Sequence, residues 1–127
     1  MEQYLIDTNV ISDYFSASFS AGGIALMDTV FDAVPKLSVI TQIELLCWKT
    51  DAATEQKIKN FIADSIVLDI SPEVIVQCVN LRKGKKIKTP DAIIAATALA
   101  YGYTLITDNK KDFANIKGLK IINPHKG

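Results

Sequence analysis

Short apolar segments that alternate with helical segments predict a three-layer α/β/α fold with a parallel, five-stranded sheet. The chain has 127 residues, a length typical of one domain, and we expect residues 1–127 to form a single domain. Hydrophobic residues make up 49% of the sequence, with only 6 Gly and 4 Pro, which argues against a disordered chain.

The first half of the chain predicts two strands and four helices. Residues 3–6 are apolar and end in the turn residues Asp7-Thr8-Asn9, and residues 16–23 are rich in Ser, Ala and Gly. Ile43, Leu46 and Cys47 share one helical face after the second strand. The predicted elements are a strand at 3–6, helices at 10–15 and 24–33, a strand at 37–40, and helices at 41–47 and 51–63.

The second half predicts three strands and three helices. Ser71-Pro72-Glu73 is typical of a helix start, and Thr89-Pro90-Asp91 repeats that pattern. Gly84 and Gly102 are expected to end these two helices, the second of which is apolar enough to be largely buried. The predicted elements are a strand at 66–70, helices at 72–83 and 92–101, a strand at 104–107, a helix at 109–114 and a strand at 119–122.

Composition excludes several classes of protein. With 14 basic and 14 acidic residues the net charge is zero, so a strongly basic DNA-coating protein is excluded. No apolar run approaches the roughly 20 residues of a membrane helix, and no secretory leader is visible, so we expect a cytoplasmic protein. The two cysteines are expected to stay reduced, and a single histidine argues against histidine-based zinc chemistry.

Acidic residues follow or lie near the ends of several predicted strands. The carboxyl ends of parallel strands meet at one edge of a sheet, where ligand sites form, so these carboxylates are expected to converge. Converging carboxylates repel one another unless a cation is bound, and oxygen ligands suit Mg²⁺ or Mn²⁺. The sequence therefore predicts a metal site with catalytic acids Asp7, Glu44, Asp91, Asp108 and Asp112.

Each acid also has an ordinary structural interpretation. Asp7 and Asp108 are possible helix caps, and Asp112 is a possible exposed helix charge. Thr41-Gln42-Ile43-Glu44 fits a capping box, in which Glu44 accepts from the backbone of Thr41. Asp91 in a first helical turn favours the positive end of the helix dipole.

Two further groups of side chains accompany the acids. Hydroxyl and amide groups are expected to orient the carboxylates or a water molecule, although turn and cap roles also fit them; these are Thr8, Asn9, Thr107 and Asn109. A basic run is either a solvated helix end or a patch that attracts phosphate groups beside the site; it comprises Arg82, Lys83, Lys85, Lys86 and Lys88.

Four segments together resemble the PIN domain family, with the closest likeness to the VapC toxins of toxin–antitoxin pairs. They are Asp7-Thr-Asn9, a Glu near the second strand, Thr-Pro-Asp-Ala-Ile-Ile-Ala-Ala-Thr-Ala at 89–98, and Thr107-Asp-Asn-Lys-Lys-Asp-Phe113. The segment around Asp91 is the most specific. The resemblance extends from about residue 3 to about residue 123, and it implies the five-stranded parallel sheet that the pattern predicts.

The resemblance implies a metal-dependent endoribonuclease that cleaves RNA phosphodiesters. Asp7, Glu44 and Asp91 match three acids of the family motif, and Asp7 and Asp91 are expected to hold Mg²⁺ or Mn²⁺. Many relatives have Asp where this chain has Asn109, so we expect Asp108 and Asp112 to share the role of the fourth acid.

The resemblance also implies a homodimer and a cognate antitoxin that inserts a segment near the acidic cleft. Candidate contact residues are aromatic, with core packing as the alternative; they are Tyr14, Phe15, Phe19 and Trp48.

Three other functions are alternatives to a toxin ribonuclease. A phosphoacceptor signalling domain has similar layers but needs paired acids after the first strand, where this chain has Asp7 alone. An inactive PIN-shaped binding module is compatible with Asn109. A PIN nuclease of RNA processing, outside toxin–antitoxin systems, shares the same acids.

Overall fold

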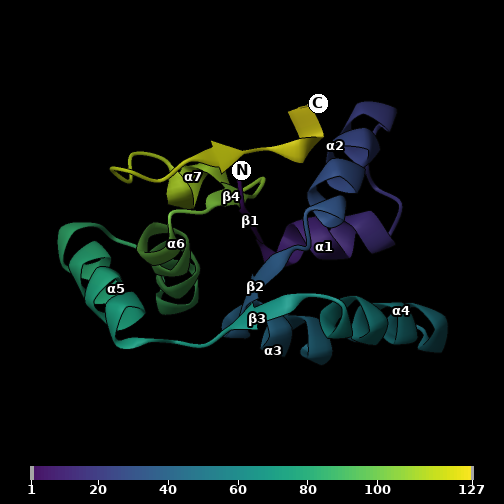
Figure 1. The fold of residues 1–127 in the computed structure, drawn as a ribbon, viewed down its shortest axis with the longest axis horizontal. Helices are drawn as coiled ribbons and strands as arrows, with labels where there is room; N and C mark the ends of the chain where they lie inside the picture. The colour runs from purple at the N-terminus through teal and green to yellow at the C-terminus, as the bar shows by residue number, and fades with distance from the viewer. Residues whose placement is uncertain (1, 127) are drawn as a thin grey trace.

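A computed structural model describes residues 2–126, which form one five-stranded sheet with helices on both of its faces (Figure 1). The elements are, in chain order, β1 (Tyr4–Ile6), α1 (Thr8–Phe15), α2 (Ala21–Asp32), β2 (Lys36–Ser38), α3 (Val39–Cys47), α4 (Ala52–Ala63), β3 (Ile66–Leu68), α5 (Pro72–Gly84), α6 (Thr89–Tyr101), β4 (Thr104–Ile106), α7 (Lys110–Phe113), β5 (Ile121–Ile122) and the 3₁₀ turn η1 (Pro124–Lys126).

The sheet is parallel throughout, with the strand order β3-β2-β1-β4-β5. β1 lies in the centre, and its Leu5 pairs with Lys36 of β2 and with Leu105 of β4. Parallel neighbours require crossover connections, which the intervening helices supply. The predicted α/β/α fold with a five-stranded parallel sheet is therefore confirmed.

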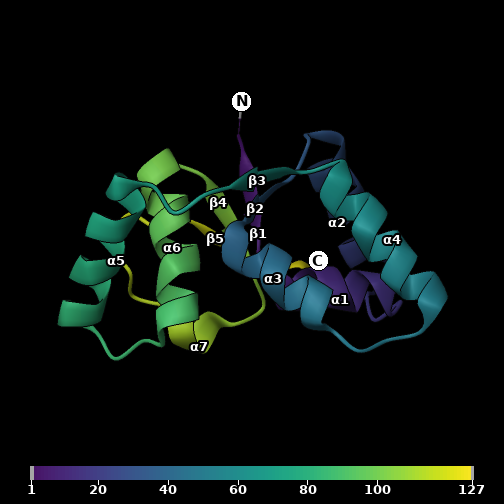
Figure 2. The ribbon, with the colours of Figure 1, turned by 90° about the horizontal axis from the view of Figure 1, so that it is seen from below.

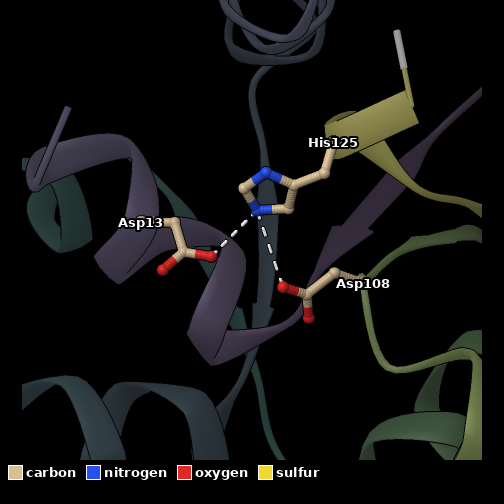
Figure 3. A group of neighbouring side chains, drawn as sticks. All are labelled: Asp13, Asp108 and His125. Atoms are coloured by element: carbon tan, nitrogen blue, oxygen red, sulfur yellow. Dashed lines mark hydrogen bonds and ion pairs between the residues drawn. The ribbon is translucent and has the colours of Figure 1, made fainter. Parts of the chain in front are cut away.

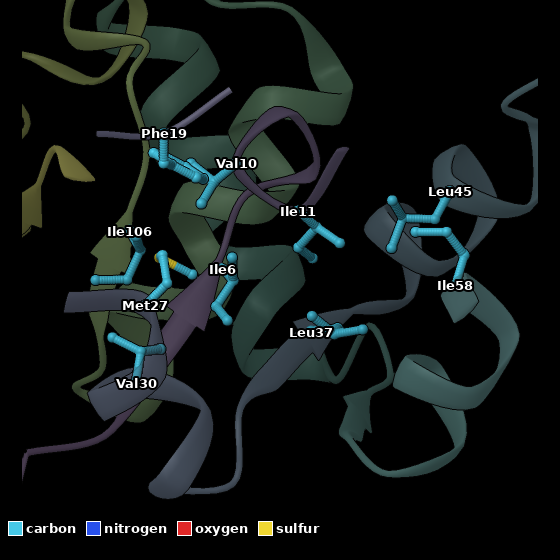
Figure 4. Close-up of a cluster of buried hydrophobic side chains, with 10 residues drawn as sticks. All are labelled: Ile6, Val10, Ile11, Phe19, Met27, Val30, Leu37, Leu45, Ile58 and Ile106. Atoms are coloured by element: carbon cyan, nitrogen blue, oxygen red, sulfur yellow. The ribbon is translucent and has the colours of Figure 1, made fainter. Parts of the chain in front are cut away.

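Two hydrophobic clusters hold the layers together, one on each face of the sheet. Ile6 and Ile106 point to the face covered by α1 and α2, where their side chains pack with Met27 and Val30 (Figure 4). Leu5 and Leu105 alternate to the opposite face. Because successive strand residues point to opposite faces, the central strands are buried on both sides, as their uninterrupted apolar runs predict.

α6 covers the second face, and α5 packs on its outer side (Figures 1 and 2). The buried residues of α6 include Ala92, Ile94 and Ala95, so the prediction of a largely buried helix is confirmed. The helix ends at Gly102, whose φ of 71° lies in the left-handed region that glycine adopts without a Cβ clash. Ser71 caps α5 by accepting from the N–H of Val74, also as predicted.

The boundary between β2 and α3 differs from the prediction. The strand was expected to run to Ile40, but it ends at Ser38, whose hydroxyl accepts from the N–H of Ile40 and caps α3. Side-chain capping of Val39 and Ile40 overrides their β propensity. The same helix buries Thr41 and Leu45, and it leaves Ile43 and Leu46 about half exposed, so the predicted apolar face is the outer one.

Other ends of helices and strands differ from their predicted positions by one to three residues, because element ends fray and are the least sharply defined parts of an element. α6 starts at Thr89, and its cap residue is Lys88 without a side-chain bond, so the prediction that Thr89 caps this helix is wrong. Within residues 2–126, no helix is both long and apolar enough to span a membrane.

One edge of the sheet gathers the ends of several elements. Figure 2 shows α1, α3, the start of α6 and α7 at the edge where β1 and β4 end. The acids of the predicted site lie on these elements.

Candidate metal and nuclease site

Asp7 lies directly after β1 and is held by the neighbouring strand β4. Its backbone N–H donates to the carbonyl of Ile106 (2.9 Å), and its Oδ2 accepts from the Thr107 hydroxyl (2.8 Å). Its Oδ1 accepts from the N–H of Thr8 (2.8 Å), so Asp7 also caps α1, as its ordinary interpretation predicted. The residue is only 5% exposed, so burial and these hydrogen bonds together fix the orientation of its carboxylate.

Burial raises the pKa of Asp7 from 3.8 to about 6. The hydrogen bonds from Thr107 and Thr8 favour the ionised form and lower the pKa, whereas the negative charges of Asp91 and Glu44 raise it. Asp7 therefore interacts electrostatically with both Asp91 and Glu44. These three carboxylates destabilise one another when all of them are ionised.

Glu44 lies on α3 and contacts the first turn of α1. The Thr8 hydroxyl donates to Glu44 Oε1 (2.6 Å) and lies 3.1 Å from the hydroxyl of Thr41. Because Ser38 caps α3, the capping-box interpretation of Thr41 and Glu44 is wrong. The Glu44 carboxylate is thus directed toward α1 and not toward its own helix start.

Asp91 lies in the first turn of α6 and is half-buried. Its pKa is raised by burial and by the charges of Asp112 and Glu44, and it is lowered by Lys88. The acid therefore interacts with carboxylates from two different elements, α3 and α7.

Asp112 lies on α7 and is oriented by Asn109. The Asn109 side chain donates from Nδ2 to Asp112 Oδ2 (3.0 Å) and accepts from the Asp112 N–H at Oδ1 (3.2 Å). The Asn109 N–H donates to Thr107 Oγ1 (3.0 Å), and that hydroxyl donates to Asp7. A continuous hydrogen-bonded chain therefore links Asp112 to Asp7 through two of the predicted accessory residues.

Asp108 belongs to a different group of side chains. Its Oδ2 lies 3.6 Å from His125 Nε2, which also lies 2.9 Å from Asp13 Oδ2 (Figure 3). The prediction that Asp108 caps a helix is wrong, because Asn109 caps α7. Sequence reasoning did not find the group of Asp13, Asp108 and His125, since its members are far apart along the chain.

Two hollows adjoin the acids. The first has a volume of about 380 Å³ and is lined by Arg82, Lys86, Ile87, Lys88 and Asp112. The second has a volume of about 500 Å³, and its lining includes Thr8, Asn9, Ser12, Ser16, Glu44 and Trp48. Asp91 interacts electrostatically with one acid from the lining of each hollow, Asp112 in the first and Glu44 in the second.

The five residues of the predicted basic run have different surroundings. Arg82, Lys86 and Lys88 line the first hollow, and Arg82 Nε also donates to the carbonyl of Ile87 (3.2 Å). Lys85 Nζ donates to the carbonyl of Ala114 (2.7 Å), which ties α5 to the segment after α7. Lys83 is exposed near the end of α5 and does not line either hollow.

The aromatic residues proposed as partner contacts pack on the core. Phe19 is buried, whereas Tyr14, Phe15 and Trp48 are half-buried against the cluster beside α1 and α2. Tyr14 makes edge contacts with Phe15 and Phe31 at ring-centroid distances of 5.3 and 4.8 Å. The alternative of core packing is therefore confirmed for this group.

The acids that interact at this edge fit a hard divalent cation. All four are carboxylates, and mutual repulsion adds to burial in raising the pKa of both Asp7 and Asp91. A cation bound among them relieves this repulsion, and oxygen donors suit Mg²⁺ or Mn²⁺. The four acids that the structure brings together are Asp7, Glu44, Asp91 and Asp112.

Comparisons with known proteins agree with this fold. The PIN domain family model matches residues 4–119. Ribonuclease VapC1 of Methanocaldococcus jannaschii is 31% identical over 126 residues, covering 92% of this chain and 85% of the relative. A chain of a toxin–antitoxin complex from Klebsiella pneumoniae superposes with a TM-score of 0.79 at 32% identity, covering 96% of this chain and 98% of that one.

A chain of DNA-bound VapBC from Salmonella typhimurium has the same fold. It superposes with a TM-score of 0.79 at 21% identity, covering 98% of this chain and 99% of that one. From these matches and the sheet topology, the chain belongs to the PIN domain family.

Proposed function

We propose that this chain is a metal-dependent endoribonuclease, acting as the toxin of a toxin–antitoxin pair. The observation that supports the proposal is that four acids, one directly after β1 and the others on α3, α6 and α7, interact at one edge of the sheet, with a raised pKa at both Asp7 and Asp91. The relative named a ribonuclease and the similar chain from a toxin–antitoxin complex support the same reaction and biological setting.

Mg²⁺ or Mn²⁺ is the proposed cofactor, held by Asp7 and Asp91. When bound, such an ion neutralises charge on the phosphate and helps to generate a hydroxide nucleophile. Thr107 keeps the buried Asp7 carboxylate oriented through its hydroxyl, and Thr8 does the same for Glu44.

Glu44 and Asp112 are proposed to position the attacking water and accept its proton. Both interact electrostatically with Asp91, Glu44 from α3 and Asp112 from α7, and either carboxylate is suited to accept a proton. In-line attack by water leaves a 5′-phosphate and a 3′-hydroxyl, without the 2′-hydroxyl as nucleophile. Asp108, which interacts with His125, is not assigned a step.

Asn109 is proposed to act through Asp112 as a positioning residue. Asn109→Ala removes the amide that donates to Asp112 Oδ2, so we expect catalytic activity or Mg²⁺ affinity to fall by about 10- to 100-fold. Cleavage rates measured over a range of Mg²⁺ concentrations check this, with Asn60→Ala on exposed α4 as the matched control. Equal behaviour of the two variants contradicts the role.

Arg82, Lys86 and Lys88 are proposed to hold the RNA backbone beside the acids. Single-stranded RNA is the expected substrate, because its strand is accessible to a site at a sheet edge. In the double variant Lys86→Gln/Lys88→Gln, we expect the slope of log affinity against log salt to fall by about 0.7 for each phosphate that the protein no longer neutralises. Lys117→Gln/Lys120→Gln, on exposed residues outside the first hollow, is the control. An unchanged salt dependence of binding contradicts the RNA-contact role and favours the alternative, that this basic run is a solvated helix end.

The proposed partners are an RNA substrate, a cognate antitoxin and a second copy of the chain. The similar chain from a toxin–antitoxin complex supports the antitoxin, and a cytoplasmic location follows from the proposed RNA target. Expression without the antitoxin is expected to arrest growth. Normal growth at high expression favours a PIN nuclease of RNA processing instead.

The decisive test of the reaction is product mapping on total RNA, with Mg²⁺ and with a chelator. We expect new ends only when Mg²⁺ is present, and the downstream fragments should carry 5′-phosphates that a 5′-phosphate-dependent ligase accepts. The Asp91→Asn variant controls for contaminating nucleases. Cleavage that persists with chelator, or 5′-hydroxyl products, contradicts the proposed mechanism, and no cleavage at all favours an inactive binding module.

A further inference from the structure

The second hollow, beside Glu44, has a chemistry different from that of the basic hollow. It is an open hollow lined by residues of α1 and α3 and by their cap residues Ser16 and Trp48, and its polar lining residues are uncharged except for Glu44. From this lining we propose that the hollow is a nucleobase subsite, in which an unpaired RNA base stacks on Trp48 while Asn9 contacts its edge. The inference rests on the proposed nuclease function and adds a base preference to it.

Charge favours a base over a phosphate in this hollow. No Lys or Arg is among its described lining residues, and the Glu44 carboxylate repels an anion. The basic hollow has the opposite character, with Arg82, Lys86 and Lys88 in its lining. An RNA strand that contacts both hollows therefore has a cationic surface for its backbone in one, and in the other a lining without basic side chains.

Trp48 gives the hollow a stacking surface. It is the cap residue of α3, where its N–H donates to the carbonyl of Leu45 (3.3 Å), and its side chain is half-buried against the core. Anchoring of this kind holds a ring in place at little entropic cost on binding, and the ring also lines the hollow. Stacking between aromatic side chains and unpaired bases is a general mode of single-stranded RNA recognition.

The side-chain amide of Asn9 gives the hollow a group that can form hydrogen bonds with the edge of a nucleobase. Its side-chain amide is exposed on α1, and across residues 2–126 it makes no hydrogen bond to another side chain or to the backbone. An amide presents one donor and one acceptor side by side, the arrangement that pairs with the edge of a base such as adenine. The Ser12 hydroxyl, one turn later, donates to the Asn9 carbonyl and remains an acceptor in the lining.

The position of the hollow predicts where the preference appears in the products. Thr8 lines the hollow, and it donates from its N–H to Asp7 Oδ1 (2.8 Å) and from its hydroxyl to Glu44 Oε1 (2.6 Å), so a base seated there belongs to a nucleotide next to the scissile phosphate. Cleavage is therefore expected beside a preferred base and not at random within single-stranded segments.

Trp48 is the sole tryptophan of the chain, so all tryptophan fluorescence comes from this residue. We expect adenosine 5′-monophosphate and a short single-stranded oligoribonucleotide to quench it saturably in chelator, where no cleavage occurs. Ribose 5-phosphate, which has no base, should leave it unchanged. Asn9→Ala is expected to weaken nucleotide binding by about 3- to 10-fold, the equivalent of one hydrogen bond. Asn80→Ala, on exposed α5, should bind as the unaltered protein does.

A second measurement uses product mapping on a randomised single-stranded RNA. Trp48→Ala is expected to lose the base preference beside the cut and to raise the KM by about 5- to 150-fold, the range of 1–3 kcal/mol measured for stacking of one base. Trp48→Phe, which keeps an aromatic face, should retain the preference. The two Trp48 variants are first compared by circular dichroism, because this residue also packs on the core.

The outcomes separate this subsite from the proposed nuclease function. Saturable quenching without any RNA cleavage supports the base subsite and contradicts the nuclease. Cleavage with unchanged fluorescence on nucleotide addition, and with equal base preference in Trp48→Ala, overturns the subsite alone. Equal quenching by ribose 5-phosphate, or quenching only by a protein partner, also overturns it.

Discussion

Asp91→Asn is expected to reduce metal-dependent RNA cleavage by about a thousandfold or more while the protein remains folded. Asp91 interacts with Asp112 and with Glu44 and is proposed to hold the cation, so loss of its charge removes several kcal/mol of transition-state stabilisation. Asparagine has nearly the same shape, and the Asp91 side chain neither caps its helix nor lies fully buried, so the fold is expected to persist.

The measurement is single-turnover cleavage of a labelled RNA, together with thermal unfolding of both proteins. Asp64→Asn, at the exposed end of α4, is the matched control and should retain activity. Activity of Asp91→Asn at the level of the control removes Asp91 from the site. A large loss of thermal stability would instead assign Asp91 a structural role.

Asp7→Asn is expected to abolish cleavage and, in metal-free solution at pH 7, to make the protein more stable. Burial holds the folded-state pKa of Asp7 near 6, above its ordinary value of 3.8, so ionisation at neutral pH destabilises the fold. That difference corresponds to at most about 3 kcal/mol. Asparagine carries no charge, and it caps helices as well as aspartate does, so the bond to the Thr8 N–H can be kept.

The direction in which stability changes with pH tests whether the raised pKa of Asp7 causes the difference between the two proteins. Between about pH 4 and pH 6 the folded state binds the Asp7 proton and the unfolded state does not, so stability falls as the pH rises through this window. Below pH 4 Asp7 is protonated in both states, and wild type and Asp7→Asn should differ least. Urea unfolding at several pH values, in chelator, measures the difference between the two proteins.

Addition of Mg²⁺ at pH 7 should reduce the difference in unfolding free energy between wild type and Asp7→Asn, because a bound cation stabilises the ionised Asp7 carboxylate of the wild type. A stability difference that stays constant from pH 4 to pH 7 contradicts a raised Asp7 pKa. A difference that Mg²⁺ leaves unchanged contradicts the metal role of Asp7.

The local pattern of the chain determined most of the fold. The strands that contain Leu5-Ile6 and Leu105-Ile106 are uninterrupted apolar runs, whose side chains are buried on both faces of the sheet. Runs of this kind are typical of a parallel sheet covered by helices on both faces. The Ser71-Pro72 start and the Gly102 end were predictable because capping depends on neighbours in sequence. The prediction for the second strand was wrong beyond Ser38, where a side-chain cap competes with β propensity.

The interaction of acids from distant segments was also predictable, because the ends of parallel strands meet at one edge of the sheet. Asp7, Glu44, Asp91 and Asp112 follow from that rule and from the resemblance to a known family. The direction in which each carboxylate points was not predictable. The capping box predicted for Glu44 and the helix cap predicted for Asp108 were both wrong, since Ser38 and Asn109 cap those helices instead.

The sequence by itself determined that carboxylates lie at one end of the sheet, because strand direction and alternation are local properties. Only the tertiary structure decided that Asp112 interacts with Asp91, whereas Asp108 interacts with His125 across more than a dozen intervening residues. It also decided that Trp48 and Asn9 line one hollow while Lys86 lines another. Contacts between distant segments depend on how the helices pack on the sheet, and the spacing of residues along the chain does not encode that packing.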